Sequence, residues 1–118
     1  MVDSDKKESA VTTIGRKFDS GKPDYDLLPS FSLEEVVKVL TVGKEKYEKN
    51  NWAFVNDAQS RYFSAAMRHL WAWRRGELND PESNLNHLSH SICCILFLLE
   101  MQLLSEEELH KQYGKKSQ

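Results

Sequence analysis

The spacing of apolar residues predicts four helices and no strand in this chain. Apolar side chains recur at intervals of three and four over 33–47 and again over 58–75, which is the period of a helix with one buried face. A third helix is predicted over 81–104, and its second half is almost wholly apolar. A short polar helix is predicted over 105–113. The fold class is therefore all-α, a small bundle of three main helices with a short C-terminal helix.

Local signals mark several of the predicted helix ends. Ser32 with Glu35, and Ser105 with Glu108, each have the spacing of a capping box at a helix N-terminus. Gly76 is the predicted stop of the second helix, because glycine readily adopts the left-handed conformation that closes many helices.

The third helix is apolar on every side in its second half, so it needs neighbours all round. Three short helices cover such a helix poorly. We therefore expect self-association into a dimer or a higher oligomer, with the third helix at the contact.

Length and charge fit one small domain. The chain has 118 residues, which we divide into a flexible leader over 1–13, a single all-α domain over 14–113 and a tail over 114–118. Its net charge of −2 gives no broad basic surface, so duplex nucleic acid is not an expected partner.

A cytoplasmic location is expected from the cysteines and the apolar runs. Cys93 and Cys94 are neighbours in one helix and cannot pair without strain, so both are expected to be free thiols. The longest apolar run, 92–104, is interrupted by Glu100 and Gln102 and is too short to cross a bilayer. No membrane partner is expected.

The stretch GRKFDSGKPDYDLLP, residues 15–29, has the period of neither a helix nor a strand. Lys17 and Lys22 bring positive charge, and Gly21 allows backbone amides to face an anion. The glycine spacing is not that of a P-loop. We expect an ordered, charged loop that closes over a phosphate, although a disordered leader is the simpler alternative.

Basic and aromatic residues elsewhere suit a nucleotide better than a bare anion, because arginine matches phosphate oxygens and indole rings stack on bases. The alternative is that the tryptophans belong to the core and the cations to the solvated surface. The candidate nucleotide-binding residues are Lys17, Lys22, Lys44, Trp52, Arg68, His69 and Trp73.

Carboxylates and histidines near the start of the third helix could hold a divalent cation. Magnesium would use carboxylates together with phosphate oxygens, and the candidates are Glu35, Asp80 and Glu82. His87 and His90 lie three apart on one helical face and could instead bind a transition metal or hydrogen-bond to a ligand. A buried, hydrogen-bonded histidine and a capping role for Glu35 are the structural alternatives.

Several motifs in order resemble one phage-encoded family. The stretches GRKFDSGKPDYDLLP, LEEVVKVLTVGKEKY, NNW, YFSAAMRHLWAWRRGE and DPESNLNHLSHSICCILFLLE are similar to the family named for the N-terminal domain of dATP/dGTP diphosphohydrolases. The resemblance covers about residues 14–101. It implies a small all-α domain related in kind to the MazG-like nucleotide pyrophosphohydrolases, and hence a place in the cytoplasm of a bacterial host.

The MazG-like enzymes cleave nucleoside triphosphates between the α and β phosphates, with magnesium held by helix carboxylates. Their pattern has Glu-Glu-x-x-Glu on one helix and Glu-x-x-Asp on the next. In this chain Glu34 and Glu35 match the first two glutamates, but Lys38 stands where the third glutamate should be. A second frame, Glu45 with Glu48 and then Glu77 with Asp80, has the right letters, but its second half lies between Gly76 and Pro81 and is not expected to be helical. That frame comprises the positions EKYE and ELND.

Three hypotheses follow. The first is a magnesium-dependent pyrophosphohydrolase of purine deoxynucleoside triphosphates, with Glu35, Asp80 and His87 as catalytic candidates. The second is a non-catalytic module that sequesters a nucleotide second messenger of host antiphage immunity, which the lysine at position 38 favours. The third is an interaction domain that works with a separate catalytic partner.

Overall fold

The computed structural model describes residues 14–114. The leader predicted over 1–13, and residues 115–118 of the predicted tail, lie outside this part. The described elements, in chain order, are the short 3-10 turn η2 (Tyr25–Leu27), α1 (Ser30–Lys46), the 3-10 turn η3 (Asn51–Phe54), α2 (Ala58–Arg74), α3 (His87–Leu103) and α4 (Glu106–Tyr113). The all-α prediction is confirmed: across 14–114 the only β-type pairing is one isolated bridge between Asn79 and Asn86.

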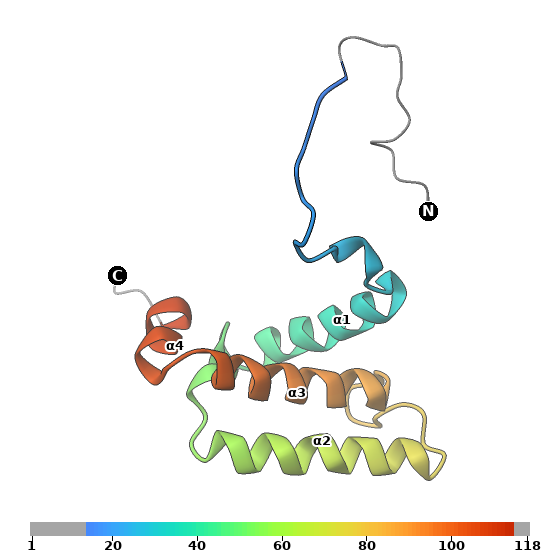
Figure 1. Cartoon of the computed structure of the whole chain (residues 1–118). Helices are drawn as coiled ribbons and strands as arrows, with labels where there is room; N and C mark the ends of the chain where they lie inside the picture. The colour runs from blue at the N-terminus through green and yellow to red at the C-terminus, as the bar shows by residue number, and fades with distance from the viewer. Residues whose placement is uncertain (1–13, 115–118) are drawn as a thin grey trace.

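The predicted central helix is central. α3 packs against α2 on one side and against α1 on the other, and α2 and α3 run in opposite directions (Figure 1). α4 follows α3 after a sharp bend of 119° and lies at the end of the bundle (Figure 1). The segment before α1 runs away from the three long helices, and every residue of it is exposed (Figure 1).

Small side chains form the contacts between the long helices. The Ser91 hydroxyl donates a hydrogen bond of 2.7 Å to the Ala66 carbonyl, which joins α3 to α2. The Cys93 thiol donates to the Val36 carbonyl at 3.5 Å, which joins α3 to α1. The buried apolar residues are correspondingly small in number and mostly small in size: Val36, Ala53, Ala66, Cys93, Cys94 and Leu109.

Many of the apolar side chains that recur at helical spacing therefore remain exposed to solvent. Leu33 and Val37 on α1 are 43% and 50% exposed, although they share a helical face with buried Val36. Phe63 and Leu70 on α2 are 59% and 39% exposed. The period correctly predicted the helices, but fewer neighbours pack on these faces than a closed bundle would supply.

The predicted start of the first helix is wrong. α1 begins at Ser30, and the Pro29 carbonyl accepts its first helical hydrogen bond from the Leu33 amide at 3.1 Å. Ser32 is thus inside the helix and cannot cap it. Glu35 instead accepts a 2.8 Å hydrogen bond from Lys38, one turn further along the exposed surface.

The predicted start of the third helix is also wrong, by six residues, since α3 begins at His87. Residues 80–85 fold back on themselves: the Asp80 amide donates to the Leu85 carbonyl at 2.8 Å and the Asn84 amide donates to the Asp80 carbonyl at 2.7 Å. Asn84 has a positive φ of 62°, which a continuing helix does not allow. Asn86 is the true N-cap, and its side chain accepts from the Leu88 amide at 2.8 Å.

Two of the predicted end signals are confirmed. Gly76 follows α2 with a φ of 105° and donates its amide to the Trp73 carbonyl at 2.9 Å. Ser105 and Glu108 form the complete capping box that opens α4.

The two thiols are free and buried, as predicted, with Cys93 only 3% exposed and Cys94 8%. Burial raises the pKa of Cys93 to about 12, with the neighbouring Cys94 adding to the effect, and burial also raises the pKa of Cys94. Because the thiolate is the reactive form, we expect labelling by a maleimide at pH 8 to be at least about 100-fold slower in the folded protein than in denaturant. Stopped-flow labelling in the two conditions measures this, and rates within tenfold of each other would contradict it.

Among residues 14–114, no single helix has the length and apolarity to cross a membrane, although α3 and α4 together pass that test as a bent pair.

Candidate functional site

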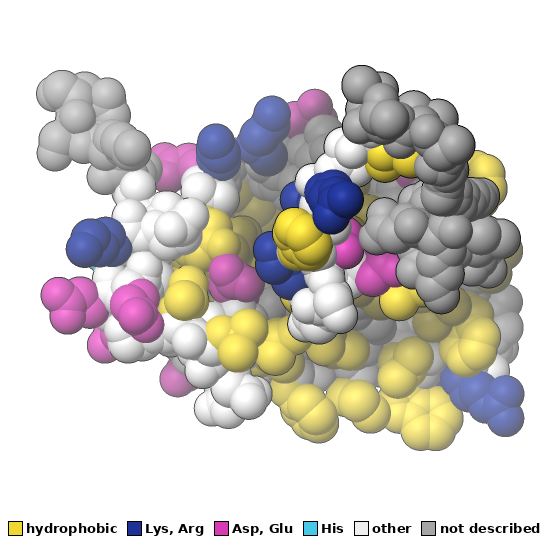
Figure 2. Space-filling view, turned by 45° about the horizontal axis from the view of Figure 1, so that its top comes forward, with side chains coloured by type: hydrophobic (Ala, Val, Ile, Leu, Met, Phe, Trp, Pro, Cys, Tyr) yellow, Lys and Arg dark blue, Asp and Glu magenta, His cyan; other side chains and the backbone are white. Residues whose placement is uncertain are grey.

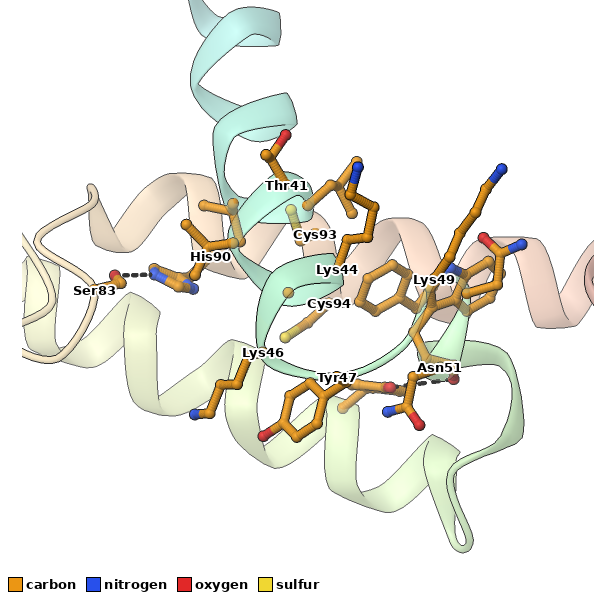
Figure 3. Close-up of a pocket in the computed structure, with 18 of the residues that line it drawn as sticks. Thr41, Lys44, Lys46, Tyr47, Lys49, Asn51, Ser83, His90, Cys93 and Cys94 are labelled. Carbon is orange, nitrogen blue, oxygen red and sulfur yellow. Dashed lines mark hydrogen bonds between the residues drawn. The ribbon is translucent and has the colours of Figure 1, made fainter.

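A cavity of about 650 Å³ lies where the C-terminal end of α1 and the loop after it meet α2 and α3. Its size falls within the range of ordinary small-molecule sites. Figure 3 shows the cavity beneath the last turns of α1, with Cys93 and Cys94 on its inner side and His90 toward one end.

Three lysines surround the opening. Lys44 and Lys46 come from the last turn of α1, and Lys49 comes from the loop that follows. In Figure 3 the amino groups of Lys44 and Lys49 extend to the same side of the cavity, whereas Lys46 extends to the other. Lys46 donates a 3.0 Å hydrogen bond to Glu82, whose side chain is 77% exposed.

Trp52 lines the cavity and is held by aromatic contacts. Its indole ring is stacked on Phe97 of α3, with centroids 4.7 Å apart and planes 6° apart, and it makes an edge-to-face contact with Tyr113, with centroids 4.9 Å apart. Tyr62 donates its hydroxyl to the Trp52 carbonyl at 3.1 Å, and burial raises the pKa of Tyr62 to about 12. Trp52 therefore holds η3 and α4 to α3 while also lining the cavity, and one of its ring faces is already occupied.

Three histidines from α2 and α3 form a cluster, and two of them, His69 and His90, line the cavity. The Nδ1 atoms of His69 and His87 are 2.9 Å apart, and the rings of His69 and His90 are stacked with centroids 4.5 Å apart. His87 is 3% exposed, and its Nε2 is 2.7 Å from Glu77 Oε1. A carboxylate accepts, so His87 Nε2 donates in that contact. In neutral His87 the Nδ1 atom is then an acceptor, and the shared proton belongs to His69 Nδ1.

The surroundings favour uncharged rings in two of the three histidines. Burial lowers the pKa of His69 to about 4, and the nearby His90 lowers it further in the same direction. Burial likewise lowers the pKa of His90. Both rings are therefore neutral at neutral pH and can accept a hydrogen bond or donate a lone pair.

The loop between α2 and α3 brings acidic groups to this cluster. Burial raises the pKa of Asp80, but hydrogen bonds from Ser83 outweigh this effect and the pKa is lowered overall. One of those bonds runs from the Ser83 amide to Asp80 Oδ2 at 3.0 Å. The Ser83 hydroxyl also lies 2.7 Å from His90 Nε2. Asp80 is thus an oriented carboxylate beside the histidines.

The fold gathers about half of the candidates inferred from sequence. The candidates that line the cavity are Lys44, Trp52, His69, Asp80, Glu82 and His90, and His87 contacts this group from behind through His69. The candidates that do not line it are Lys17, Lys22, Glu35, Arg68 and Trp73. Lys17 and Lys22 belong to the exposed segment before α1, which does not fold over the cavity in this structure (Figure 1).

Three residues of the site, Lys46, Lys49 and Ser83, were not singled out from the sequence, and Glu77 was considered only as part of a carboxylate frame. Lys46 and Lys49 belong to the stretch KEKYEK, whose alternating charge also fits an ordinary solvated surface. Glu77 and Ser83 orient His87 and Asp80, and no sequence motif marks such supporting contacts. Their proximity depends on the fold of the loop, which begins after Gly76 stops α2.

The donor atoms at this end of the cavity differ from those that magnesium prefers. His69, Asp80 and His87 each offer one ligand atom, and all three atoms lie within 4.8 Å of one another. Two imidazole nitrogens and one carboxylate oxygen do not form the oxygen-rich set that binds magnesium. Glu35 is paired with Lys38 and is not among the cavity residues, so the three carboxylates expected as a magnesium site do not converge.

The fold and site define the class of protein: an all-α domain with a lysine-rimmed cavity suited to a small ligand. The chain belongs to the family described as dATP/dGTP diphosphohydrolase, N-terminal, whose model matches residues 12–111. It is also 32% identical over 84 residues to a protein of Salmonella phage PMBT28 named dATP/dGTP diphosphohydrolase. The match covers 71% of this chain but only 28% of the relative. No solved structure was found to match. The resemblance inferred from the motifs is confirmed.

Proposed function

We propose that this chain binds a purine deoxynucleoside triphosphate in the cavity at the end of α1 and hydrolyses it between the α and β phosphates. The observation that carries the proposal is the cavity itself, which joins three lysines to an oriented carboxylate and neutral histidines. The family and the name of the phage relative support a nucleotide as the ligand. The proposed setting is the cytoplasm of a bacterial host.

The charges allow a division of roles. Lys44 and Lys49, which carry no ion pair shorter than 4.0 Å among the described residues, are placed to contact phosphate oxygens. Asp80 is the carboxylate best placed to accept a proton from an attacking water, because Ser83 fixes its orientation. His87 lies behind His69 and acts as a positioning residue rather than as a group in contact with substrate.

In this proposal, magnesium reaches the cavity already bound to the triphosphate of the substrate. Magnesium bound to a triphosphate keeps several waters and usually takes only one or two protein carboxylates. Glu82 lines the cavity and could supply one, whereas Glu35 is paired with Lys38 and does not line the cavity.

One observation favours a second candidate, a module that sequesters a nucleotide without hydrolysing it. The carboxylate set of the MazG-like pattern is incomplete here, because Lys38 takes the third position and is paired with Glu35. The lysines and the cavity would serve binding alone equally well. A nucleotide second messenger of host immunity is the ligand proposed for this candidate.

Incubation with nucleoside triphosphates and cyclic nucleotides, with and without magnesium, tests both candidates. We expect a purine deoxynucleoside monophosphate and pyrophosphate to appear, by liquid chromatography and mass spectrometry, only when magnesium is present. An intact nucleotide recovered from denatured protein would support sequestration instead. If neither a product nor a bound nucleotide is detected, both candidates are contradicted and the interaction domain is the remaining hypothesis.

The Lys44→Ala variant should weaken the interaction with nucleotide about tenfold, the loss expected when one charged hydrogen bond to phosphate is removed. KM for the hydrolase, or Kd for the binding module, measures the change. Lys111→Ala is the matched control, since Lys111 is an exposed lysine on α4 that does not line the cavity. Equal effects of the two substitutions would exclude this cavity as the phosphate site.

We also propose that two copies of the chain associate through α3. Five residues of α3 recur at helical spacing and remain partly exposed, and we call them the α3 stripe: Ile92 (41%), Ile95 (53%), Leu96 (43%), Leu99 (46%) and Leu103 (67%). Hydrophobic side chains also cover much of the lower part of the face in Figure 2. Monomeric proteins rarely leave such continuous apolar surface in water.

A further inference from the structure

We propose that His69, Asp80 and His87 form a binding site for a first-row transition metal such as zinc or cobalt, distinct from any magnesium carried by a nucleotide. The three ligand atoms lie within 4.8 Å of one another and come from two helices and the loop between them. Two imidazoles and one carboxylate are a donor set that suits such metals.

The distance between the two imidazoles fits a metal with little movement. In a tetrahedral site with metal–nitrogen bonds of about 2.0–2.1 Å, two nitrogens stand roughly 3.3 Å apart. The His69 and His87 Nδ1 atoms are 2.9 Å apart while they share a proton. Replacing that proton with a metal ion requires the two atoms to separate by a few tenths of an ångström and the rings to turn so that both nitrogens point toward the ion.

A supporting shell is already in place around the proposed ligands. Metal-binding histidines commonly donate their second ring nitrogen to a carboxylate, which fixes the ring and makes it a better ligand. Glu77 makes this contact with His87 Nε2 at 2.7 Å, which leaves His87 Nδ1 to face His69. This arrangement is more specific than a chance grouping of polar residues, because His87 is only 3% exposed.

The other two ligands are held as well. The Ser83 amide donates to Asp80 Oδ2 at 3.0 Å, so the carboxylate cannot turn freely. The His69 ring is stacked on His90, with an angle of 11° between their planes. Preset side chains lower the entropy lost when a metal binds.

Three protein ligands leave at least one coordination position open. Sites with an open position are typical of metals that bind water or a substrate, whereas structural sites are closed by four protein ligands. His69 and Asp80 line the cavity, so the open position would be reached from the same space that the proposed nucleotide occupies. The metal site shares Asp80 with the proposed hydrolysis but does not depend on it, and it can be tested without any nucleotide.

The experiment is a cobalt titration of metal-free protein from which any polyhistidine tag has been removed. We expect visible absorption bands that saturate at one cobalt per chain, that zinc abolishes by displacement, and that millimolar magnesium leaves unchanged. Absence of saturable bands, or displacement by magnesium, would overturn the proposal. Because no nucleotide is present, failure here is separate from failure of the triphosphate assay.

Variants locate the site. His69→Gln and Asp80→Asn are close in size to the originals, and each should weaken cobalt binding at least tenfold. Glu77→Gln should weaken it by about 10–100-fold, the range seen when a supporting carboxylate is lost. His110→Gln is the matched control, since His110 is exposed on α4 and outside the cluster.

Circular dichroism first confirms that each variant is folded. Cobalt affinity unchanged by His69→Gln and Asp80→Asn, or reduced as much by His110→Gln, would place the metal elsewhere and refute the proposal. Binding that falls in His69→Gln, Asp80→Asn and Glu77→Gln but not in the control supports it.

Discussion

Trp52→Ala is expected to lower the free energy of unfolding by about 3 kcal/mol, toward the low end of the cost of deleting a large aromatic side chain because the ring is only partly buried. The indole is stacked on Phe97 and touches the edge of Tyr113, so its loss separates η3 and α4 from α3. With so few buried side chains in the described chain, no other packing compensates.

Urea unfolding followed by circular dichroism measures the effect. Trp52→Phe should restore more than half of the lost stability, since a smaller ring can still stack on Phe97. Trp71→Ala is the control on α2, where the side chain is 52% exposed, and should change the free energy of unfolding by less than about 1 kcal/mol. A stable Trp52→Ala protein that has lost only nucleotide affinity would contradict the structural role and make Trp52 a base-stacking residue.

The helices could be predicted from the sequence because their signals are local. The apolar period, the glycine after α2 and the Ser105–Glu108 capping box each act within one or two turns of chain. The start of α3 could not be predicted in the same way. Pro81 is compatible with a first helical turn, but the contacts between Asp80 and Leu85 and the left-handed Asn84 stabilise a loop instead. Residues 81–86 could locally form either a helical turn or a loop, and the hydrogen bonds within the loop favour the loop.

The candidate site could be predicted only in part, for a similar reason. His69, Asp80 and His87 were each candidates, yet nothing in their spacing shows that three atoms from two helices and a loop lie within 4.8 Å. The expected ligand Glu35 illustrates the opposite case. Glu35 matches one position of a magnesium-binding pattern, but Lys38 stands where that pattern has its third carboxylate and donates a hydrogen bond to Glu35.

The second half of the MazG-like acidic frame is not presented from a helix in the described part of the chain. The stretch from Glu77 to Asp80 lies outside any helix, as expected, because Gly76 ends α2 before it and α3 starts after it. Glu77 supports His87, and Asp80 faces the histidines. The acidic positions of this loop thus contact a histidine cluster rather than forming a row of helix carboxylates, which connects the proposed metal site to this chain's departure from that pattern.

The double variant Ile95→Lys/Leu99→Lys is expected to convert a dimer into a monomer. Two charges in the middle of the α3 stripe would have to be buried at the contact, and an unpaired buried charge costs several kcal/mol. Because dimerisation places each stripe against a second copy, four charges would meet there, which corresponds to a loss of association by at least about 1,000-fold. Both side chains are about half exposed in the single chain, so the helices themselves should survive.

Size-exclusion chromatography with light scattering measures the mass, at protein concentrations from about 1 to 100 μM, and circular dichroism checks the helical content. Leu78→Lys is the matched control, because Leu78 is 60% exposed but lies outside α3. A wild-type protein that stays monomeric throughout this range would contradict the proposed dimer. A dimer that persists in the double variant would place the contact on another apolar surface, with α1 the first alternative because Leu33 and Val37 are also exposed there.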